Sequence, residues 1–351
     1  VVGPNINLKA IINGNFSTSA NGVFDAESLQ VINGTMTINS NDLITVENEI
    51  DEVSPGQLVI ESDAYVIQNT DAVNNGFPEV QRLSTPMIRL DYTAWSSPVG
   101  NTNLLNFSPN TLPNRFYTYN PAGVDTATSW ISVADPSTTS FSVGTGYLIR
   151  VDNTWSSSVS SPYLGRFYGR LNNGPYNTSV GIGYNLIGNP YPSPIDADVF
   201  LADNSGIGAT TMYFWTHTIP SSGGTYAQNN YASYTTAGGV AAAAGGAQPD
   251  GTIQVGQGFF INATSAGNAQ FNNAQRVGSS SGQFFKNTSV ERHRYWLNLS
   301  SDSNASNQMM VAYMTGATNG IDNGYDATPL SETSDMFYTV ADNENLVIQG
   351  R

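Results

Sequence analysis

The first stretch of the chain, residues 6–70, alternates apolar and polar positions in short steps separated by Asn, Gly, Ser and Asp. The shift along the chain that places Leu29 on Leu58 also places Val31 on Ile60, and alternate residues are apolar in both copies. Such alternation is typical of strands with one inward face. Short strands repeated with turn residues between them indicate a stacked β-solenoid, whose coils bury one another's inner face. A plain β-meander is the alternative.

A second pattern repeats three elements in the same order, at residues 83–165 and again at 184–275. Each copy has an apolar strand ending in a Pro turn, then an aromatic strand, then a strand that begins with Gly-x-Gly. These elements are 92–98, 115–120 and 143–150 in the first copy and 184–190, 212–217 and 255–262 in the second. The spacing between corresponding residues of the two copies increases after the first element, mostly because of a Gly-, Ala- and Ser-rich insert around 218–250. We therefore predict two similar antiparallel units.

Local residue types refine these two units. Gly-x-Gly before a hydrophobic strand lets the backbone bulge, or pack where a side chain would clash. The aromatic strands carry apolar residues on both faces, so we expect them to be covered on both sides. Ala237–Gly251 is expected to form an exposed hairpin tip or a long loop. The best helix candidate is short, Pro194–Ala202, with Asp196 or Ser193 as its N-cap.

A different pattern of predicted strands begins near residue 290. Strands are predicted at Arg292–Leu299 and Gln308–Met314, joined by the polar turn Ser301–Asn307, and Asn345–Arg351 has the pattern of a further strand. Because a domain that stops in a strand looks unfinished, we expect the natural polypeptide to continue. The start at Val1, without Met, suggests that an export signal has been removed.

Together these patterns predict an all-β fold in four parts. Residues 1–80 form a short β-solenoid, and residues 81–180 and 181–289 form two duplicated antiparallel β-sandwich-like units. Residues 290–351 begin a C-terminal β domain.

Composition narrows the function classes. Hydrophobic residues make up 39% of the chain and charged residues only 11%, so Asn, Ser, Thr and Gly must cover much of the surface. The formal charge of −15 disfavours nucleic acid and anionic lipid as partners. No run of about 18 apolar residues occurs, so we expect no membrane-spanning segment. The absence of Cys excludes disulfides and thiol nucleophiles.

Few residues suggest chemistry, and we expect neither an active site nor a bound cofactor. His217 and His293 have no evident carboxylate partners and are interpreted as ordinary surface or strand-end residues. Gly278–Gly282 matches the nucleophile elbow but lacks the strand before and the helix after it, which indicates a linker. Calcium could bind at Asp302–Ser306, or at Asp322 and Asp326, although a turn held by side chains is the default for both.

Sugar binding is a further alternative. A glycosidase needs two carboxylates about 5–10 Å apart, and sequence does not say which acids meet. The Trp side chains could stack on sugars, although large aromatics in strands more often belong to the core. Trp155, among Asn, Thr and Ser, is the best candidate for an exposed ring.

Residues 80–351 contain several segments whose sequences resemble those of Bacteroidota surface proteins exported by the type IX secretion system. The segments are Leu90–Val99, Asn185–Ser193, Gly251–Phe259, Glu291–Leu299 and Tyr313–Thr318. The resemblance implies an extracellular location, the type IX export machinery as a partner, and a C-terminal sorting domain that these residues do not include. Asp125-Thr126-Ala127 also resembles the O-glycosylation signal of these bacteria, which places a glycan on Thr126.

We therefore expect a non-catalytic cell-surface structural or adhesion protein that contacts surface glycans or other surface proteins. A carbohydrate-binding or polysaccharide-degrading surface protein is the alternative, because solenoids and sandwiches host both functions. A filament subunit is a third hypothesis.

Overall fold

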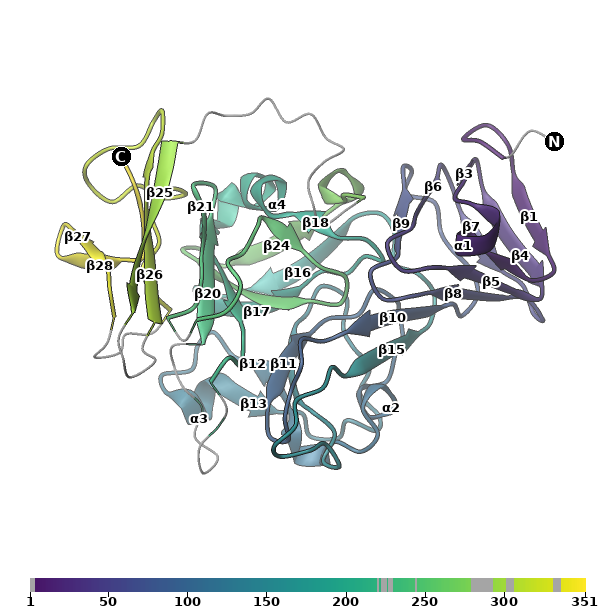
Figure 1. Ribbon diagram of the computed structural model, residues 1–351, viewed down its shortest axis with the longest axis horizontal. Helices are drawn as coiled ribbons and strands as arrows, with labels where there is room; N and C mark the ends of the chain where they lie inside the picture. The colour runs from purple at the N-terminus through teal and green to yellow at the C-terminus, as the bar shows by residue number, and fades with distance from the viewer. Residues whose placement is uncertain are drawn as a thin grey trace.

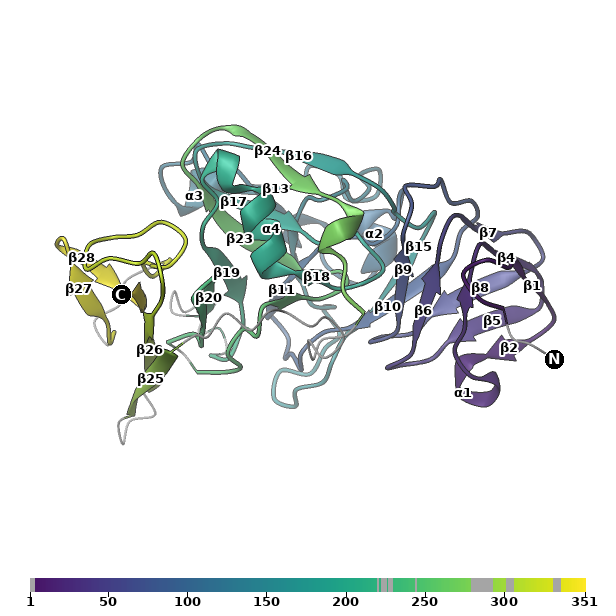
Figure 2. The same cartoon turned by 90° about the horizontal axis from the view of Figure 1, so that it is seen from above.

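The structure is a computed structural model that describes residues 4–219, 221, 226, 230–243, 245–278, 293–300, 306–330 and 336–351. It is all-β, as predicted. The solenoid and the C-terminal β unit lie at opposite ends of the long axis, and the two repeats lie between them (Figures 1 and 2). Within the described residues, no helix has the length and apolar character needed to cross a membrane.

The N-terminal segment is a β-solenoid of about three turns, built from parallel strands in three sheets. The first sheet holds β1 (Ala10–Asn13), β4 (Leu29–Asn33) and β7 (Ile50–Glu52); the second holds β2 (Phe16–Ser17), β5 (Thr35–Ile38) and β8 (Gln57–Ile60); the third holds β3 (Asp25–Ala26), β6 (Leu43–Val46) and β9 (Tyr65–Gln68). A short helix, α1 (Thr18–Asn21), lies between β2 and β3. The solenoid prediction is confirmed.

The predicted superposition of Leu29 on Leu58 as equivalent places in successive coils is wrong. Leu29 pairs with Ala10 in the coil before it and with Ile50 in the coil after it, whereas Leu58 pairs with Met36. The shift from Leu29 to Leu58 therefore advances one coil and one face further. Both residues are buried in the core, but they lie in different sheets. Because all three faces have the same inward alternation, the pattern matched across faces as well as across coils.

The solenoid continues into the first repeat without a break. The strand β10 (Glu79–Leu83) pairs in parallel with β8 and antiparallel with β15 (Leu164–Tyr168). One hydrophobic cluster runs from solenoid residues such as Ile60 to repeat residues such as Phe167. The predicted domain boundary at residues 80/81 thus falls inside β10.

The two repeats contain sheets with the same strand order. The first sheet runs β11 (Tyr92–Trp95), β14 (Tyr147–Arg150), β12 (Phe116–Tyr119), β13 (Trp130–Ser132); the second runs β17 (Gly183–Gly188), β23 (Gly258–Ala263), β19 (Met212–Trp215), β20 (Tyr231–Thr235), β21 (Gly238–Val240). The register agrees as well, because Phe116 pairs with Ile149 as Met212 pairs with Ile261. The three elements recognised twice in the sequence therefore occupy matching places.

Each sheet is covered on its outer face by a strand pair and a short helix. The first repeat uses β10 with β15 and the helix α2 (Leu104–Phe107); the second uses β16 (Tyr176–Val180) with β24 (Gly267–Phe271) and the helix α4 (Ala197–Asp203). Rings pair alike in both, Phe107 on Phe167 at 4.7 Å and Phe200 on Phe271 at 5.1 Å. The predicted helix near Pro194 is confirmed as α4, with Asp196 as its N-cap.

The inner faces of the two sheets pack against each other. Phe260 from the second repeat contacts the rings of Tyr119 and Trp130 from the first, at 4.9 and 5.8 Å between centroids. Ala94 and Tyr213 are buried in the same cluster. Both faces of these sheets are therefore covered, as the aromatic strands predicted.

Two matching backbone bonds join the repeats where this packing ends. The Ser96 N–H donates to the Gly256 carbonyl (2.8 Å), and the Gly188 N–H donates to the Gly144 carbonyl (3.0 Å). Ser96 occupies in the first repeat the place of Gly188 in the second, and Gly144 that of Gly256. Each repeat thus makes the same contact to the other, which gives the pair an approximate two-fold relation.

Glycine is required at this junction for two reasons. Gly144 and Gly256 adopt φ values of +71° and +69°, which favour glycine. A Cβ atom at Gly188 would lie 2.3 Å from the Ser96 Cβ, and one at Gly146 would lie 2.6 Å from the Ile187 carbonyl oxygen. The close backbone approach predicted for Gly-x-Gly is therefore confirmed.

Arg276 fastens the solenoid to the second repeat. Its buried guanidinium donates to the Val66 carbonyl (2.6 Å), Ser193 Oγ (2.9 Å) and Asn173 Oδ1 (2.8 Å) and lies 5.0 Å from the centre of the Tyr191 ring. Burial lowers the pKa of Arg276 to about 10, so it stays charged at neutral pH.

The C-terminal unit packs on the edge of the second repeat. It contains the predicted hairpin, β25 (His293–Ser300) with β26 (Ser306–Tyr313), to which β29 (Ile348–Gly350) adds in parallel. The remaining elements are η1 (Pro113–Arg115), α3 (Thr126–Ser129), β18 (Ile195–Asp196), η2 (Ser205–Ile207), β22 (Thr252–Ile253), η3 (Asn273–Gln275), β27 (Thr339–Ala341) and β28 (Glu344–Leu346).

The expectation that Ala237–Gly251 forms an exposed tip is wrong for its first part. Ala237 and Val240 are buried under the C-terminal unit. Arg294 Nη1 donates to the Ala237 carbonyl (3.0 Å), and Trp296 Nε1 donates to the Gly239 carbonyl (2.9 Å). The small residues allow this approach, because a Cβ atom at Gly238 would lie 2.5 Å from Arg294 Nη1.

Candidate functional site

A cleft of about 780 Å³ opens between the two repeats. The first repeat contributes two segments, 85–91 and 157–160, and the second contributes the end of β19 and the segment 246–257. The lining side chains include Thr85, Ser157, Ser158, Ser160, Thr216, Thr218, Gln248, Thr252, Gln254 and Gln257. This volume lies within the range of about 300–1,000 Å³ typical of ligand sites.

Trp215 is the more exposed of the two large aromatic side chains that line the cleft, because the other, Phe214, is buried. Its indole Nε1–H donates to the Tyr92 carbonyl of the first repeat (2.8 Å), and its ring packs edge-on against Tyr231 (5.1 Å). The side chain is half-buried and lines both this cleft and a smaller adjoining cavity of about 150 Å³. Trp215 is therefore held in a fixed orientation with part of its ring exposed to the cleft.

His217 lies two residues beyond Trp215, in a backbone conformation with φ of +47°. Its Nε2 lies 3.0 Å from Thr85 Oγ1 and 3.2 Å from the Pro86 carbonyl, so it bridges the repeats. Among the described residues, no hydrogen-bond partner meets the buried Nδ1. Burial lowers the pKa of His217, so the imidazole is neutral at pH 7.

Two carboxylates also line the cleft. Asp91 is buried and accepts from the Ile88 N–H (2.9 Å), and burial is the main reason that its pKa is raised. Asp250 is exposed and accepts from the Thr252 N–H (2.8 Å). No Lys or Arg occurs among the described residues that line the large cleft. Arg82, in the adjoining cavity, is paired with Asp63.

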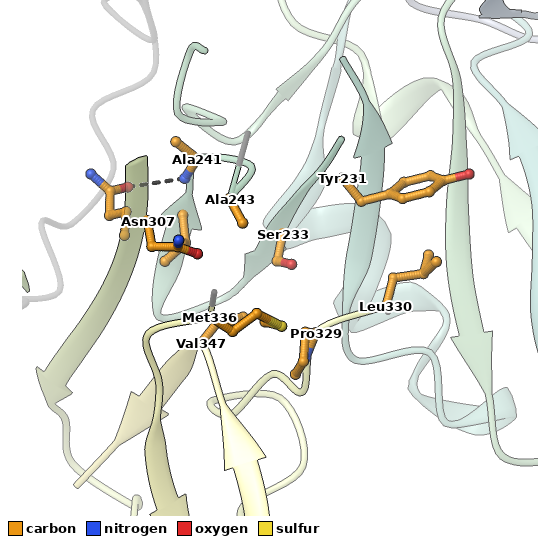
Figure 3. Close-up of a pocket in the computed structure, with 11 residues that line it drawn as sticks. Tyr231, Ser233, Ala241, Ala243, Asn307, Pro329, Leu330, Met336 and Val347 are labelled. Carbon is orange, nitrogen blue, oxygen red and sulfur yellow. Dashed lines mark hydrogen bonds between the residues drawn. The ribbon is translucent and has the colours of Figure 1, made fainter. Parts of the chain in front are cut away.

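A second hollow lies where the second repeat meets the C-terminal unit (Figure 3). Tyr231 and Ser233 line it from one side, and Pro329, Met336 and Val347 line it from the other. Its volume is about 20 Å³, which has room for little more than one water molecule. This hollow belongs to the packing of the two parts, and the larger cleft is the better candidate site.

The residues proposed from sequence lie elsewhere. Trp155 is half-buried, with its Nε1 donating to the Ser161 carbonyl (3.1 Å), and lies in the loop that supplies the cleft residues 157–160. Thr126 is exposed at the start of α3, where a glycosyltransferase could reach it. Sugar stacking by Trp155 and glycosylation of Thr126 stay predictions.

The carboxylates of Asp322 and Asp326 face backbone amides. Asp322 accepts from Thr318 N–H and Thr318 Oγ1, whereas Asp326 accepts from the Asp322 and Gly350 N–H groups (2.6 Å each). The described part of the chain contains no group of three or more His, Asp or Glu side chains placed to hold a metal. Calcium at this pair stays a prediction.

Of the remaining candidate residues from the sequence, the structure describes His293 and only the edges of two motifs. His293 begins β25 and is exposed. The residues 279–282 of the elbow-like sequence and 302–305 of the other calcium candidate lie outside the described residues.

The sequence pattern does not reveal the cleft, because the residues that line it are far apart along the chain. Asp91 and His217 are separated by most of both repeats, and only the junction of the repeats brings them together. The one local signal was the run from Trp215 to Thr218, an aromatic, two hydroxyls and an imidazole at a strand end before a long insert.

Comparison with known proteins gives a family. No curated protein and no solved structure matches the chain. A family model described as "Domain of unknown function (DUF8693)" matches residues 1–351. The chain therefore belongs to the DUF8693 family.

Proposed function

We propose that the protein is a non-catalytic extracellular surface protein, with a structural or adhesive role, that uses the cleft between its repeats to hold a surface partner. The observation that carries the proposal is the direct joining of solenoid, repeats and C-terminal unit by buried contacts, which leaves a ready-formed cleft on a stiff body. A site built on such a body loses little freedom when it binds.

The location proposed is the cell surface, after export by the type IX machinery. Its support is the resemblance in residues 80–351, together with an exterior rich in uncharged polar residues. The division of the chain into a solenoid, two duplicated β-sandwich-like units and a C-terminal β domain belongs to the same proposal. Its support is the matching strand order of the two repeats.

The test uses cells that naturally produce the protein. Protease added to intact cells should cleave the protein, and deletion of its gene should reduce attachment to surfaces coated with the cells' own exopolysaccharide. Re-expression of the intact chain should restore attachment. A protein protected inside intact cells, or unchanged attachment after deletion, would contradict the proposal.

A polysaccharide-degrading activity is the second candidate, because Asp91 and Asp250 both line the cleft. A glycosidase pairs a carboxyl of raised pKa, as general acid, with a second carboxylate, and burial raises the pKa of Asp91. Release of reducing ends from polysaccharides measures this activity. Turnover that both Asp91→Asn and Asp250→Asn abolish would replace the non-catalytic proposal.

A further inference from the structure

We propose that the cleft binds a neutral, hydroxyl-rich oligosaccharide segment, with Trp215 as the surface on which a sugar ring packs. This inference rests on the proposed function and names the chemistry of the partner. It also moves the expected sugar contact from Trp155 to a residue in the cleft.

The charges around the cleft favour a neutral ligand. A sulfate, phosphate or uronate group would meet Asp91 and Asp250 and, among the described lining residues of the large cleft, no Lys or Arg. His217 cannot supply a positive charge at pH 7, because its pKa is lowered. The net charge of −15 adds a long-range repulsion of anions.

The lining groups suit sugar hydroxyls. Ser158 and Gln248 present exposed side chains that can donate and accept hydrogen bonds, and the exposed Thr218 hydroxyl, which donates within the protein, can accept one. Trp215 supplies an apolar ring fixed by its bond to the Tyr92 carbonyl. A sugar has both C–H faces and hydroxyl edges, so a fixed ring beside hydroxyl and amide groups matches it.

The matching place on the other side of the repeat pair has different neighbours. Tyr119, the counterpart of Trp215, is half-buried and packs edge-on against Trp130 and Phe260, at 5.1 and 4.9 Å between centroids. Two residues further, Pro121 lies against Gly181, where a Cβ atom would lie 2.7 Å from the Pro121 Cγ. In the second repeat His217 takes the place of Pro121, and the insert supplies residues 246–250 as an added side of the cleft.

The experiment measures binding of the full chain by isothermal titration calorimetry. The probes are neutral tetrasaccharides of glucose, mannose, galactose or xylose, with tetragalacturonate and a heparin tetrasaccharide as anionic probes. Ser158→Trp places a large side chain in the cleft from an exposed loop, where it obstructs ligand entry. Val159→Trp is the matched control, because Val159 is exposed in the same loop but does not line the cleft. Trp215→Ala removes the ring, and circular dichroism checks the fold of each variant.

We expect at least one neutral tetrasaccharide to bind, with a Kd raised about tenfold by Trp215→Ala. Ser158→Trp should abolish binding, and Val159→Trp should leave the Kd unchanged. Absence of neutral binding at about 10 mM, tighter binding of an anionic probe, or full binding by Ser158→Trp would each overturn the inference. If no tetrasaccharide binds, and a surface protein binds at the cleft instead, the inference is likewise overturned. The adhesive role would then still stand.

Discussion

The two repeats share a strand order and a mutual contact but differ in what surrounds them. The first repeat merges its core with the solenoid through β10 and Phe167. The second has its own core around Phe259 and Phe271, and it carries the insert between β19 and β23. The shared plan determines how the repeats join, whereas the insert adds residues 246–250 to one side of the cleft. Repeated architecture and binding site are thus separable features of the same chain.

The largest effect should come from emptying the matching core positions Phe167 and Phe271. Both rings are buried, so Phe→Ala should lower the free energy of unfolding by about 3–5 kcal/mol at either position. Phe167→Ala should also increase hydrogen exchange in the solenoid strand β8, because the two share a core. Phe271→Ala should leave β8 protected. Equal exchange of β8 in both variants would contradict the asymmetry between the repeats.

A smaller loss is expected from crowding the junction of the repeats. In Gly188→Ala the added methyl would meet the Ser96 side chain, so unfolding free energy should fall by about 1–3 kcal/mol. Gly206→Ala is the control, since nothing lies within 4 Å of its Cβ position. Chemical denaturation measures both. A junction that tolerates Gly188→Ala as well as Gly206→Ala is not closely packed.

The pH dependence of the cleft should show a modest effect in one direction. Burial lowers the pKa of His217 in the folded protein below the value in the unfolded chain. As pH falls through about 6.5, the unfolded state therefore takes up a proton first, and the free energy of unfolding decreases. The raised pKa of Asp91 acts in the opposite sense at lower pH. The denaturant concentration at the unfolding midpoint of the native chain should therefore be lower at about pH 5 than at about pH 7. The difference should be smaller in His217→Gln. An unchanged slope in His217→Gln would count against a neutral, buried imidazole.

The smallest effect on stability is expected at Thr126, in the hairpin between β12 and β13. The corresponding connection in the second repeat is longer, because the insert begins there. Thr126→Ala should change unfolding free energy by less than about 0.5 kcal/mol, because the side chain is exposed. Mass spectrometry of protein from its natural source should show a glycan on Thr126 that the variant lacks. An unmodified Thr126 would remove that prediction and leave the fold untouched.

The sequence predicted what depends on local pattern. Alternation identified the solenoid strands, Asp196 identified the start of α4, and Gly-x-Gly identified the junction strands. It failed where spacing was ambiguous, since Leu29 matched Leu58 on another face. It also failed where burial came from a distant partner, since Ala237 is covered by β25 and β26 from the end of the chain. The cleft has no local pattern, because its sides come from segments in both repeats.

The central claim is that one ligand site is shared by both repeats. Hydrogen exchange of the full chain, with and without the tightest-binding neutral tetrasaccharide, tests it most directly. Residues 85–91 and residues 246–257 should gain protection together, over the same ligand concentrations. Protection confined to one repeat, or appearing only at the solenoid or the C-terminal unit, would contradict the account.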